Sequence, residues 1–237
     1  MYEDDHHKCK RKSMGIVLKR RDNAPIVKDV YGGIIDILMK EKNIEHAIRF
    51  LKESLQNIVD GKCEMDKLVI TKSLRSGYKN PQQIAHKVLA DRMGKRDSGN
   101  KPGNGDRIPY VYIENPDRKA LQGERIETPE FILKNKLKIN YAFYITNQIM
   151  KPLQQVFALV LEQMKDFRKK KGHTLQAWNK ELKNLKKDYP DVEQYKDKEE
   201  ALRNKEVKAL LFDAYIRKTN NTNKGAQEIT NFYHSSL

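Results

Sequence analysis

The fold is decided by residues 25–61, which read PIVKDVYGGIIDILMKEKNIEHAIRFLKESLQNIVDG. The first half places apolar side chains at three- and four-residue spacing, which predicts an amphipathic helix over residues 25–41 that opens at Pro25. Asn43 can cap a second helix, whose apolar spacing continues until Gly61, a residue type that ends helices. We therefore expect two packed helices at the centre of a helix-rich domain.

Shorter elements are predicted on both sides of this helix pair. Apolar runs between turn residues indicate strands, and helical spacing indicates further helices. Pro152 should kink or break the long helix in which it lies, because proline has no N–H and clashes with the preceding turn. The predicted class is α+β, mostly helical, with a few short strands and a charged helical C-terminal extension. The predicted strands are 15–18, 66–74 and 108–113, and the predicted helices are 81–96, 129–136, 140–162 and 196–217.

The charge balance of the chain points to a polyanionic partner. Its 237 residues include 47 Lys and Arg against 32 Asp and Glu, a formal net charge of +15. Such an excess attracts nucleic acid more readily than a membrane surface. Nucleic acid is therefore the first partner to consider.

Several classes of protein are excluded. Cys9 and Cys63 cannot form a disulfide framework, and no CxxC pair is present for a structural zinc site. No window of about 18 apolar residues could span a membrane. Residues 1–12 are charged and lack the apolar core of a secretory signal. We expect an intracellular protein that is neither secreted nor bound to a membrane.

The N-terminal residues contain a motif that invites a catalytic interpretation. Residues 2–5 read Tyr-Glu-Asp-Asp, but a run of His, Lys and Arg follows where a catalytic hairpin needs apolar strands. His6, His7 and Cys9 lack a fourth metal ligand. A flexible charged loop is the expected structure, and we predict neither a catalytic residue nor a metal site in this chain.

Four stretches, in this order and spacing, resemble the family B DNA polymerases of the delta type. They are MGIVLKRRDN (14–23), KLVITKSL (67–74), HKVLADRMGKRDSG (86–99) and GDRIPYV (105–111). The resemblance covers about residues 2–162, in the region where the palm of these enzymes ends and the thumb begins. The C-terminal third has no cysteine-rich modules, which looks more like the polymerases of large DNA viruses.

The resemblance implies that the chain divides into four parts and that the catalytic residues lie upstream. Residues 1–23 would end the palm, 24–162 would form the thumb, 163–218 a charged helical extension and 219–237 a flexible tail. The family's catalytic aspartates, fingers and exonuclease lie upstream of these stretches, so this chain by itself is expected to be inactive. It would bind no cofactor, whereas the complete polymerase would use Mg²⁺.

A set of cations is predicted to hold duplex primer–template DNA. Arginine donates in a planar fork to phosphate oxygens, and an acidic neighbour can orient it. At helical spacing, cations three and four residues apart share one face. A solvated basic turn and a solvated basic face remain the alternative interpretations. The predicted DNA-binding residues are Lys19, Arg20, Arg21, Asp22, Lys72, Arg92, Lys95, Arg96 and Arg107.

The C-terminal tail resembles the peptides that dock on sliding clamps. Ile229, Phe232 and Tyr233 match the Ile-x-x-aromatic-aromatic half of such peptides, in which one helical turn places three apolar side chains on one side. The usual Gln position holds Ala226, with Gln227 displaced by one residue. A disordered tail with chance aromatics is the alternative.

The predicted function is that of the C-terminal part of a DNA-directed DNA polymerase, which binds primer–template duplex. Its partners would be the palm, fingers and exonuclease domains of that enzyme, and it would act in the nucleus or at a viral replication site in the host cytoplasm. The basic run at residues 168–171 would either extend the DNA track or form a solvated helix end. The alternative function is a stand-alone basic nucleic-acid-binding protein with a thumb-like fold and no catalytic activity.

Overall fold

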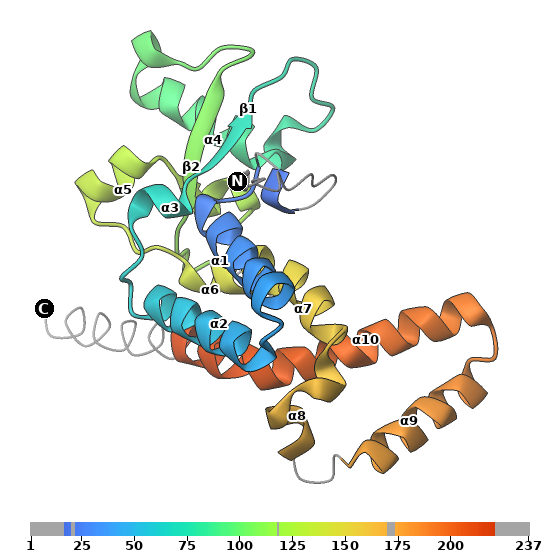
Figure 1. Cartoon of the computed structure of the whole chain (residues 1–237). Coiled ribbons are helices and arrows are strands. Elements are labelled where there is room, and N and C mark those ends of the chain that lie inside the picture. Colours follow the sequence, from blue (N-terminus) through green and yellow to red (C-terminus); the bar gives the residue numbers. More distant parts are fainter. Residues whose placement is uncertain (1–16, 20–21, 118, 170–173, 221–237) are drawn as a thin grey trace, which may run out of the picture.

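A computed structural model describes residues 17–19, 22–117, 119–169 and 174–220 of the chain. Figure 1 shows a central helix pair, a small sheet with its own helices at one end, and a helical hairpin that projects from the other end. This arrangement confirms the predicted α+β class. The strands are β1 (Ile70–Ser73), β2 (Arg107–Tyr112) and β3 (Ile126–Glu127). The helices are α1 (Pro25–Asp36), α2 (Ile44–Val59), α3 (Met65–Leu68), α4 (Ala85–Arg96), α5 (Pro129–Asn135), α6 (Tyr141–Phe143), α7 (Lys151–Ala158), α8 (Lys165–Lys169), α9 (Leu175–Asp188) and α10 (Val192–Leu211).

The central pair consists of α1 and α2, as the apolar spacing predicts. The Asn43 side chain accepts a hydrogen bond from the backbone N–H of His46 at 3.0 Å, which confirms the predicted cap. A Cβ on Gly33 would lie 2.6 Å from the ring of Phe50, so only glycine lets α1 approach α2 this closely. Apolar residues of both helices are buried in the common core, among them Val27, Val30, Ile34, Ala47, Leu51 and Leu55.

The three strands form one antiparallel sheet in the order β1-β2-β3. Ile70 pairs with Tyr110 and Ser73 with Arg107, which brings the outer ends of β1 and β2 together. On the other side of β2, Val111 pairs with Glu127 of β3. The sheet therefore fixes the relative positions of residues from three separate parts of the sequence.

The predicted strand over residues 66–74 is wrong in its first half. Met65–Leu68 form the helical turn α3, and the strand begins at Ile70. The Tyr144 hydroxyl donates to the Leu68 carbonyl at 2.8 Å and accepts from the Tyr112 backbone N–H at 3.0 Å. A buried side chain 76 residues away thus determines where β1 can start.

The predicted strand over residues 15–18 is also wrong for the part that the structure describes. Val17–Lys19 form a 3₁₀ turn. The Asn23 side chain donates to the Val17 carbonyl at 3.4 Å, and Leu18 packs against Gly32 of α1. Since this local hydrogen bond closes a turn, the backbone here folds on itself instead of extending.

The predicted disruption near Pro152 is confirmed and lies just before that residue. Tyr144–Met150 form a π-helical segment between α6 and α7. Proline lacks an N–H, and its ring crowds the carbonyl of the preceding turn, so the helix widens ahead of it. The widened segment still buries Tyr144, Ile145 and Ile149.

The C-terminal third is helical, as expected, and its helices differ in how much they bury. The second half of α10 packs on α7, where the Gln154 side chain donates to the Asn204 carbonyl at 2.9 Å. The predicted helix over 196–217 begins earlier than expected, because α10 starts at Val192. Helical backbone follows over residues 213–220. Over the described ranges, no helix has the length and apolar character that crossing a membrane requires.

Candidate nucleic-acid interface

A polar cleft of about 390 Å³ opens beside β1, and we call it the β1 cleft. It forms where the turn before α1, the outer ends of β1 and β2, and the segment before α4 meet. Three cationic side chains and one carboxylate line it. The lining residues are Asp22, Thr71, Lys72, Ser73, Arg75, Tyr78, Ile84, His86 and Arg107.

Three of the residues predicted from the sequence meet in this cleft. Lys72 of β1 lies 3.8 Å from the carboxylate of Asp22, measured from Nζ to Oδ2. Arg107 opens β2 and donates to the Thr71 carbonyl at 3.4 Å. Lys72 and Arg107 come from residues 35 positions apart, and the strand register places both at the outer end of the sheet. The cations outnumber the carboxylate, so the cleft favours an anion.

Tyr78 and His86 form one wall of the β1 cleft. Their Oη and Nε2 atoms lie 3.1 Å apart, and the Tyr78 hydroxyl also accepts from the Arg75 backbone N–H at 2.9 Å. Burial lowers the pKa of His86 below its usual 6.5, and the positive charge of Lys72 lowers it further, against a hydrogen bond with the Ser73 backbone that raises it. His86 is therefore neutral at neutral pH and packs as a hydrogen-bonding residue.

Arg75 and Tyr78 were not predicted from the sequence. The signal was present in the segment Arg75-Ser76-Gly77-Tyr78-Lys79, where cations and an aromatic residue surround a glycine with positive φ. A glycine in this conformation marks a tight turn, and such turns commonly present binding side chains. The segment brings Arg75 and Tyr78 into the cleft next to Lys72.

Arg20 and Arg21 lie outside the described residues, as does the side chain of Lys19. The backbone of Lys19 ends the 3₁₀ turn, and Asp22 is the first described residue after the gap. Because Asp22 lines the β1 cleft, the predicted basic turn adjoins the cleft in sequence. Its contact with DNA stays a prediction.

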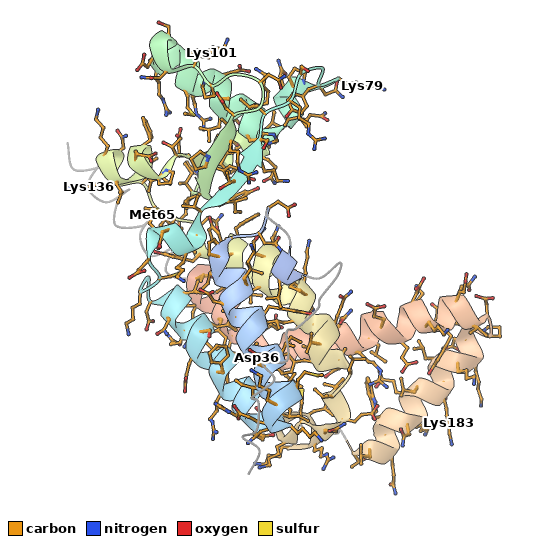
Figure 2. All side chains as sticks on the ribbon, turned by 45° about the horizontal axis from the view of Figure 1, so that its top comes forward. Asp36, Met65, Lys79, Lys101, Lys136 and Lys183 are labelled. Atoms are coloured by element: carbon orange, nitrogen blue, oxygen red, sulfur yellow. The ribbon has the colours of Figure 1, made fainter. Side chains whose placement is uncertain are left out.

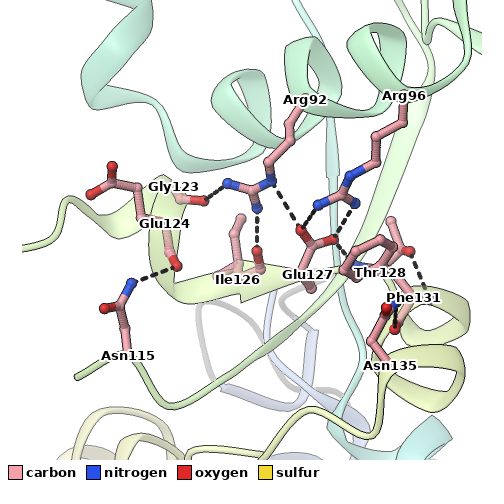
Figure 3. Close-up of polar contacts among 10 residues, drawn as sticks. All are labelled: Arg92, Arg96, Asn115, Gly123, Glu124, Ile126, Glu127, Thr128, Phe131 and Asn135. Atoms are coloured by element: carbon pink, nitrogen blue, oxygen red, sulfur yellow. Dashed lines mark hydrogen bonds and ion pairs between the residues drawn. The ribbon is translucent and has the colours of Figure 1, made fainter. Parts of the chain in front are cut away.

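Arg92 and Arg96 of α4 turn inward, toward the buried Glu127 of β3 (Figure 3). Arg96 donates two hydrogen bonds to the Glu127 carboxylate, at 2.6 and 3.1 Å, in the paired geometry that suits a guanidinium. The Arg92 Nε lies 2.9 Å from the same carboxylate, as an ion pair. Its two terminal nitrogens donate to the carbonyls of Gly123 and Ile126, at 3.0 and 2.6 Å. We call Arg92, Arg96 and Glu127 the Glu127 cluster.

The Glu127 cluster joins α4 to the far edge of the sheet. The guanidinium carbon of Arg96 also lies 3.5 Å from the centre of the Phe131 ring, over α5. A Cβ on Gly123 would lie 2.5 Å from Val88 of α4, so glycine permits the close approach that brings its carbonyl to Arg92. These contacts explain why the guanidinium groups of two arginines on one helix face point toward the sheet.

The expected shared face of residues 92, 95 and 96 is only partly present. Arg92 and Arg96 share the Glu127 cluster, although 35% of the Arg96 side chain stays exposed, whereas Lys95 is exposed and takes no part in the cluster. The structure assigns the two arginines a structural role, and DNA contact by any of the three stays a prediction. The tail residues Ile229 and Phe232, with Tyr233, lie outside the described residues.

A catalytic metal needs a cluster of ligands. In the ranges given above for the structure, no group of three or more His, Cys, Asp or Glu side chains is placed to hold a metal ion. The described residues thus do not fit a Mg²⁺ site, and no chemical step is assigned to such an ion here.

Comparison with known proteins points to the DNA polymerases. A family model described as DNA polymerase family B matches residues 1–160. A DNA polymerase of Pyramimonas orientalis virus is 51% identical over 236 residues, which are 98% of this chain and 19% of that protein. A DNA polymerase of Acanthamoeba polyphaga mimivirus is 50% identical over 167 residues, 68% of this chain and 10% of that protein.

Cellular relatives also match the chain. The DNA polymerase delta catalytic subunit of Caenorhabditis elegans is 37% identical over 159 residues, 67% of this chain and 14% of that protein. The solved family B DNA polymerase of Pyrobaculum calidifontis superimposes with a TM-score of 0.48 and 22% identity, over 57% of this chain and 18% of that chain. The chain spans about a fifth or less of the length of the curated relatives named here.

Proposed function

The chain belongs to DNA polymerase family B, and from this premise we propose that it is the part of such an enzyme that grips the primer–template duplex. The complete polymerase would carry out DNA-directed DNA synthesis. In this proposal residues 1–23 end the palm, 24–162 form the thumb, 163–218 form a charged extension and 219–237 a tail.

The β1 cleft is the observation that supports this proposal. Lys72, Arg75 and Arg107 line it against a single carboxylate, Asp22, on a chain of formal net charge +15. Cations fixed at the end of a sheet attract the phosphates of DNA, and each phosphate contact releases condensed counterions. The Asp22–Lys72 ion pair orients the lysine without neutralising the cleft as a whole. Such a surface binds the DNA backbone whatever the base sequence is.

Nucleotidyl transfer would take place elsewhere in the polymerase. In this proposal the carboxylates that would hold Mg²⁺ come from other parts of the enzyme. The role of this chain is to bind and orient the duplex, so that the primer end stays in place between additions.

Two further partners and a location belong to the same proposal. The palm, fingers and exonuclease domains would adjoin this chain, and Ile229, Phe232 and Tyr233 would dock on a sliding clamp. Such a tether raises the effective concentration of the enzyme at the primer end. The viral and delta-type relatives favour action in the nucleus or at a viral replication site.

The proposal is tested by measuring duplex binding against salt concentration. The variant K72Q/R107Q removes two cations of the β1 cleft, and K134Q/K138Q is a control that makes the same charge change on exposed residues away from it. Fluorescence anisotropy with the 237-residue chain would give the binding constant for a labelled duplex at several salt concentrations.

We expect the cleft variant to bind more weakly and to lose about two units from the slope of log K against log salt, roughly 0.9 for each lost phosphate contact. The control variant should keep the wild-type slope. Equal slopes for wild type and K72Q/R107Q would remove the β1 cleft from the interface. Duplex affinity that does not depend on salt would contradict the proposed function itself.

A further inference from the structure

Helices α9 and α10 form a hairpin that projects from the body of the protein (Figure 1). Trp178 is the one residue of α9 that is buried, whereas α10 buries Glu206, Val207 and Leu211 on its inner end. Nearly the whole surface of α9 therefore faces solvent. α9 is held in a fixed place although it contributes little to the core.

The outer face of α9 carries a row of cations. With 3.6 residues per turn, Lys180, Lys183 and Lys187 fall within an arc of about 60°, on the side opposite Trp178. All three are exposed. The acidic residues Glu181 and Asp188 lie about 80–100° away from this arc. We call Lys180, Lys183 and Lys187 the α9 lysine stripe.

The charge pattern of α10 is different. Its five cationic residues are interspersed with five acidic ones, and Arg203 pairs with Glu199 at 2.9 Å. α9 contains four lysines and two acidic residues, and none of the described ion pairs involves the α9 lysine stripe. α10 thus mixes its charges, as a solvent-exposed helix commonly does, whereas α9 concentrates its cations on one face.

Polar and aromatic contacts fix the direction in which the stripe points. The Trp178 ring donates through Nε1 to Glu162 at 3.0 Å, and Arg203 of α10 donates to the same carboxylate oxygen at 2.9 Å. The hydrogen bond from Trp178, and then that from Arg203, lowers the pKa of Glu162, so this carboxylate is charged at neutral pH. Phe167 of α8 meets the Trp178 ring edge-on, with 5.2 Å between ring centres.

We propose that the α9 lysine stripe is a second phosphate-binding surface, which contacts the backbone of duplex DNA apart from the β1 cleft. Figure 2 places Lys183 on the hairpin, at the opposite end of the molecule from Lys79, which follows Tyr78 of the cleft. The stripe spans about 10 Å along the helix. Duplex DNA carries about one charge per 1.7 Å of its axis, so a phosphate lies within reach of each lysine side chain.

Duplex DNA is favoured over single-stranded DNA as the ligand. Proteins that hold single strands place aromatic side chains under the bases. The single aromatic residue of α9 is Trp178, which is buried on the inner face. The stripe offers only flexible point charges, which suit a backbone and read no sequence. The inference rests on the proposed function, because a polymerase brings a duplex to this chain.

The variant K180Q/K183Q/K187Q tests the inference, and K196Q/K198Q/K205Q on α10 is its control. Both variants replace three exposed lysines of the same hairpin and change the net charge equally. Binding of the 237-residue chain to a duplex, and to a single strand of equal length, would be measured by anisotropy over a range of salt concentrations.

We expect the stripe variant to lose about three units from the salt slope on duplex DNA, and the α10 variant less than about one. If both variants behave alike, the inference is wrong. If the stripe variant weakens single-strand binding as much as duplex binding, the assignment to duplex is wrong.

The K72Q/R107Q variant separates the two proposals. If K72Q/R107Q lowers duplex affinity while K180Q/K183Q/K187Q binds like wild type, the inference is overturned and the proposed function stands. The reverse result would overturn the β1 cleft and support the stripe. Absence of duplex binding by the wild-type chain would overturn both.

Discussion

The arginines of α4 and the lysines of α9 look alike in the sequence and behave in opposite ways in the structure. Arg92 and Arg96 are four residues apart on one helix face, and both turn inward to the carboxylate of Glu127. Lys180, Lys183 and Lys187 also share one helix face, and all three are exposed to solvent. Cations at helical spacing therefore do not by themselves identify a nucleic-acid contact.

The difference comes from what lies opposite each helix. α4 faces β3 and the turn before it. β3 presents the buried Glu127 and the carbonyl of Ile126 to the two planar guanidinium groups, and the turn presents the carbonyl of Gly123. Arginine suits this environment because it is weakly hydrated and donates in a fork. The outer face of α9 faces solvent, where the compact and strongly hydrated ammonium of lysine keeps its water until an anion replaces it.

The largest expected effect is on the anchor of the exposed helix. Trp178→Ala removes the buried ring and its hydrogen bond to Glu162, and we expect the free energy of unfolding to fall by about 4 kcal/mol. Urea denaturation measures this loss, and hydrogen exchange should show that α9 loses protection. Leu175→Ala, on the same helix but 48% exposed, should cost less than about 1 kcal/mol. Retained protection of α9 in the tryptophan variant would mean that other contacts orient the lysine stripe.

A somewhat smaller effect is expected at the inward-facing arginines. Glu127→Ala leaves two partly exposed guanidinium groups without their carboxylate, and the loss of these charge-assisted hydrogen bonds costs about 2 kcal/mol. Urea denaturation measures the loss. Glu130→Ala removes an exposed carboxylate three residues away and should change stability by less than about 0.5 kcal/mol. If both variants are equally stable, the structural role of Arg92 and Arg96 is wrong.

The smallest effect is expected at His86, which shares the β1 cleft with Lys72. The folded protein holds the pKa of His86 below 6.5, so the unfolded chain binds a proton first as the pH falls. The contribution of His86 to stability is present above pH 6.5 and is lost as the pH falls below that value. Comparison of wild type with His86→Gln, by urea denaturation at several pH values, measures this change.

A second variant sharpens the same measurement. Lys72→Gln removes the positive charge that helps to depress the pKa of His86, so the pKa should rise toward 6.5. An NMR titration of the His86 ring measures it directly. An unchanged His86 pKa would show that burial alone causes the depression.

Much of the fold followed from local patterns. The apolar spacing of residues 25–61 predicted α1 and α2, and Asn43 predicted the cap between them. Pro152 predicted a disrupted helix, because the cause lies in its own ring. The start of β1 was predicted wrongly, since Tyr144, which packs there, is distant in sequence. The strand predicted over residues 15–18 was wrong for its described part, because the hydrogen bond from Asn23 to Val17 closes a turn.

The candidate site divides in the same way. Asp22, Lys72 and Arg107 were predicted by their chemistry and by resemblance, and the sheet brings them to one cleft. Arg75 and Tyr78 were missed because their loop has no periodic pattern. No feature of α4 itself indicated that Arg92 and Arg96 would turn inward.

The sequence by itself determined the helical framework, the family and the excess of positive charge, because periodicity, motif order and composition need no knowledge of distant contacts. Only the tertiary structure decided which cations pair with a buried carboxylate. That choice depends on Glu127, which lies 31 residues beyond Arg96 in the sequence, and on the strand register that places it beneath α4. A buried carboxylate must be paired, so it draws in the arginines within its reach. The lysines of α9 have no such residue opposite them in the described structure and stay at the surface.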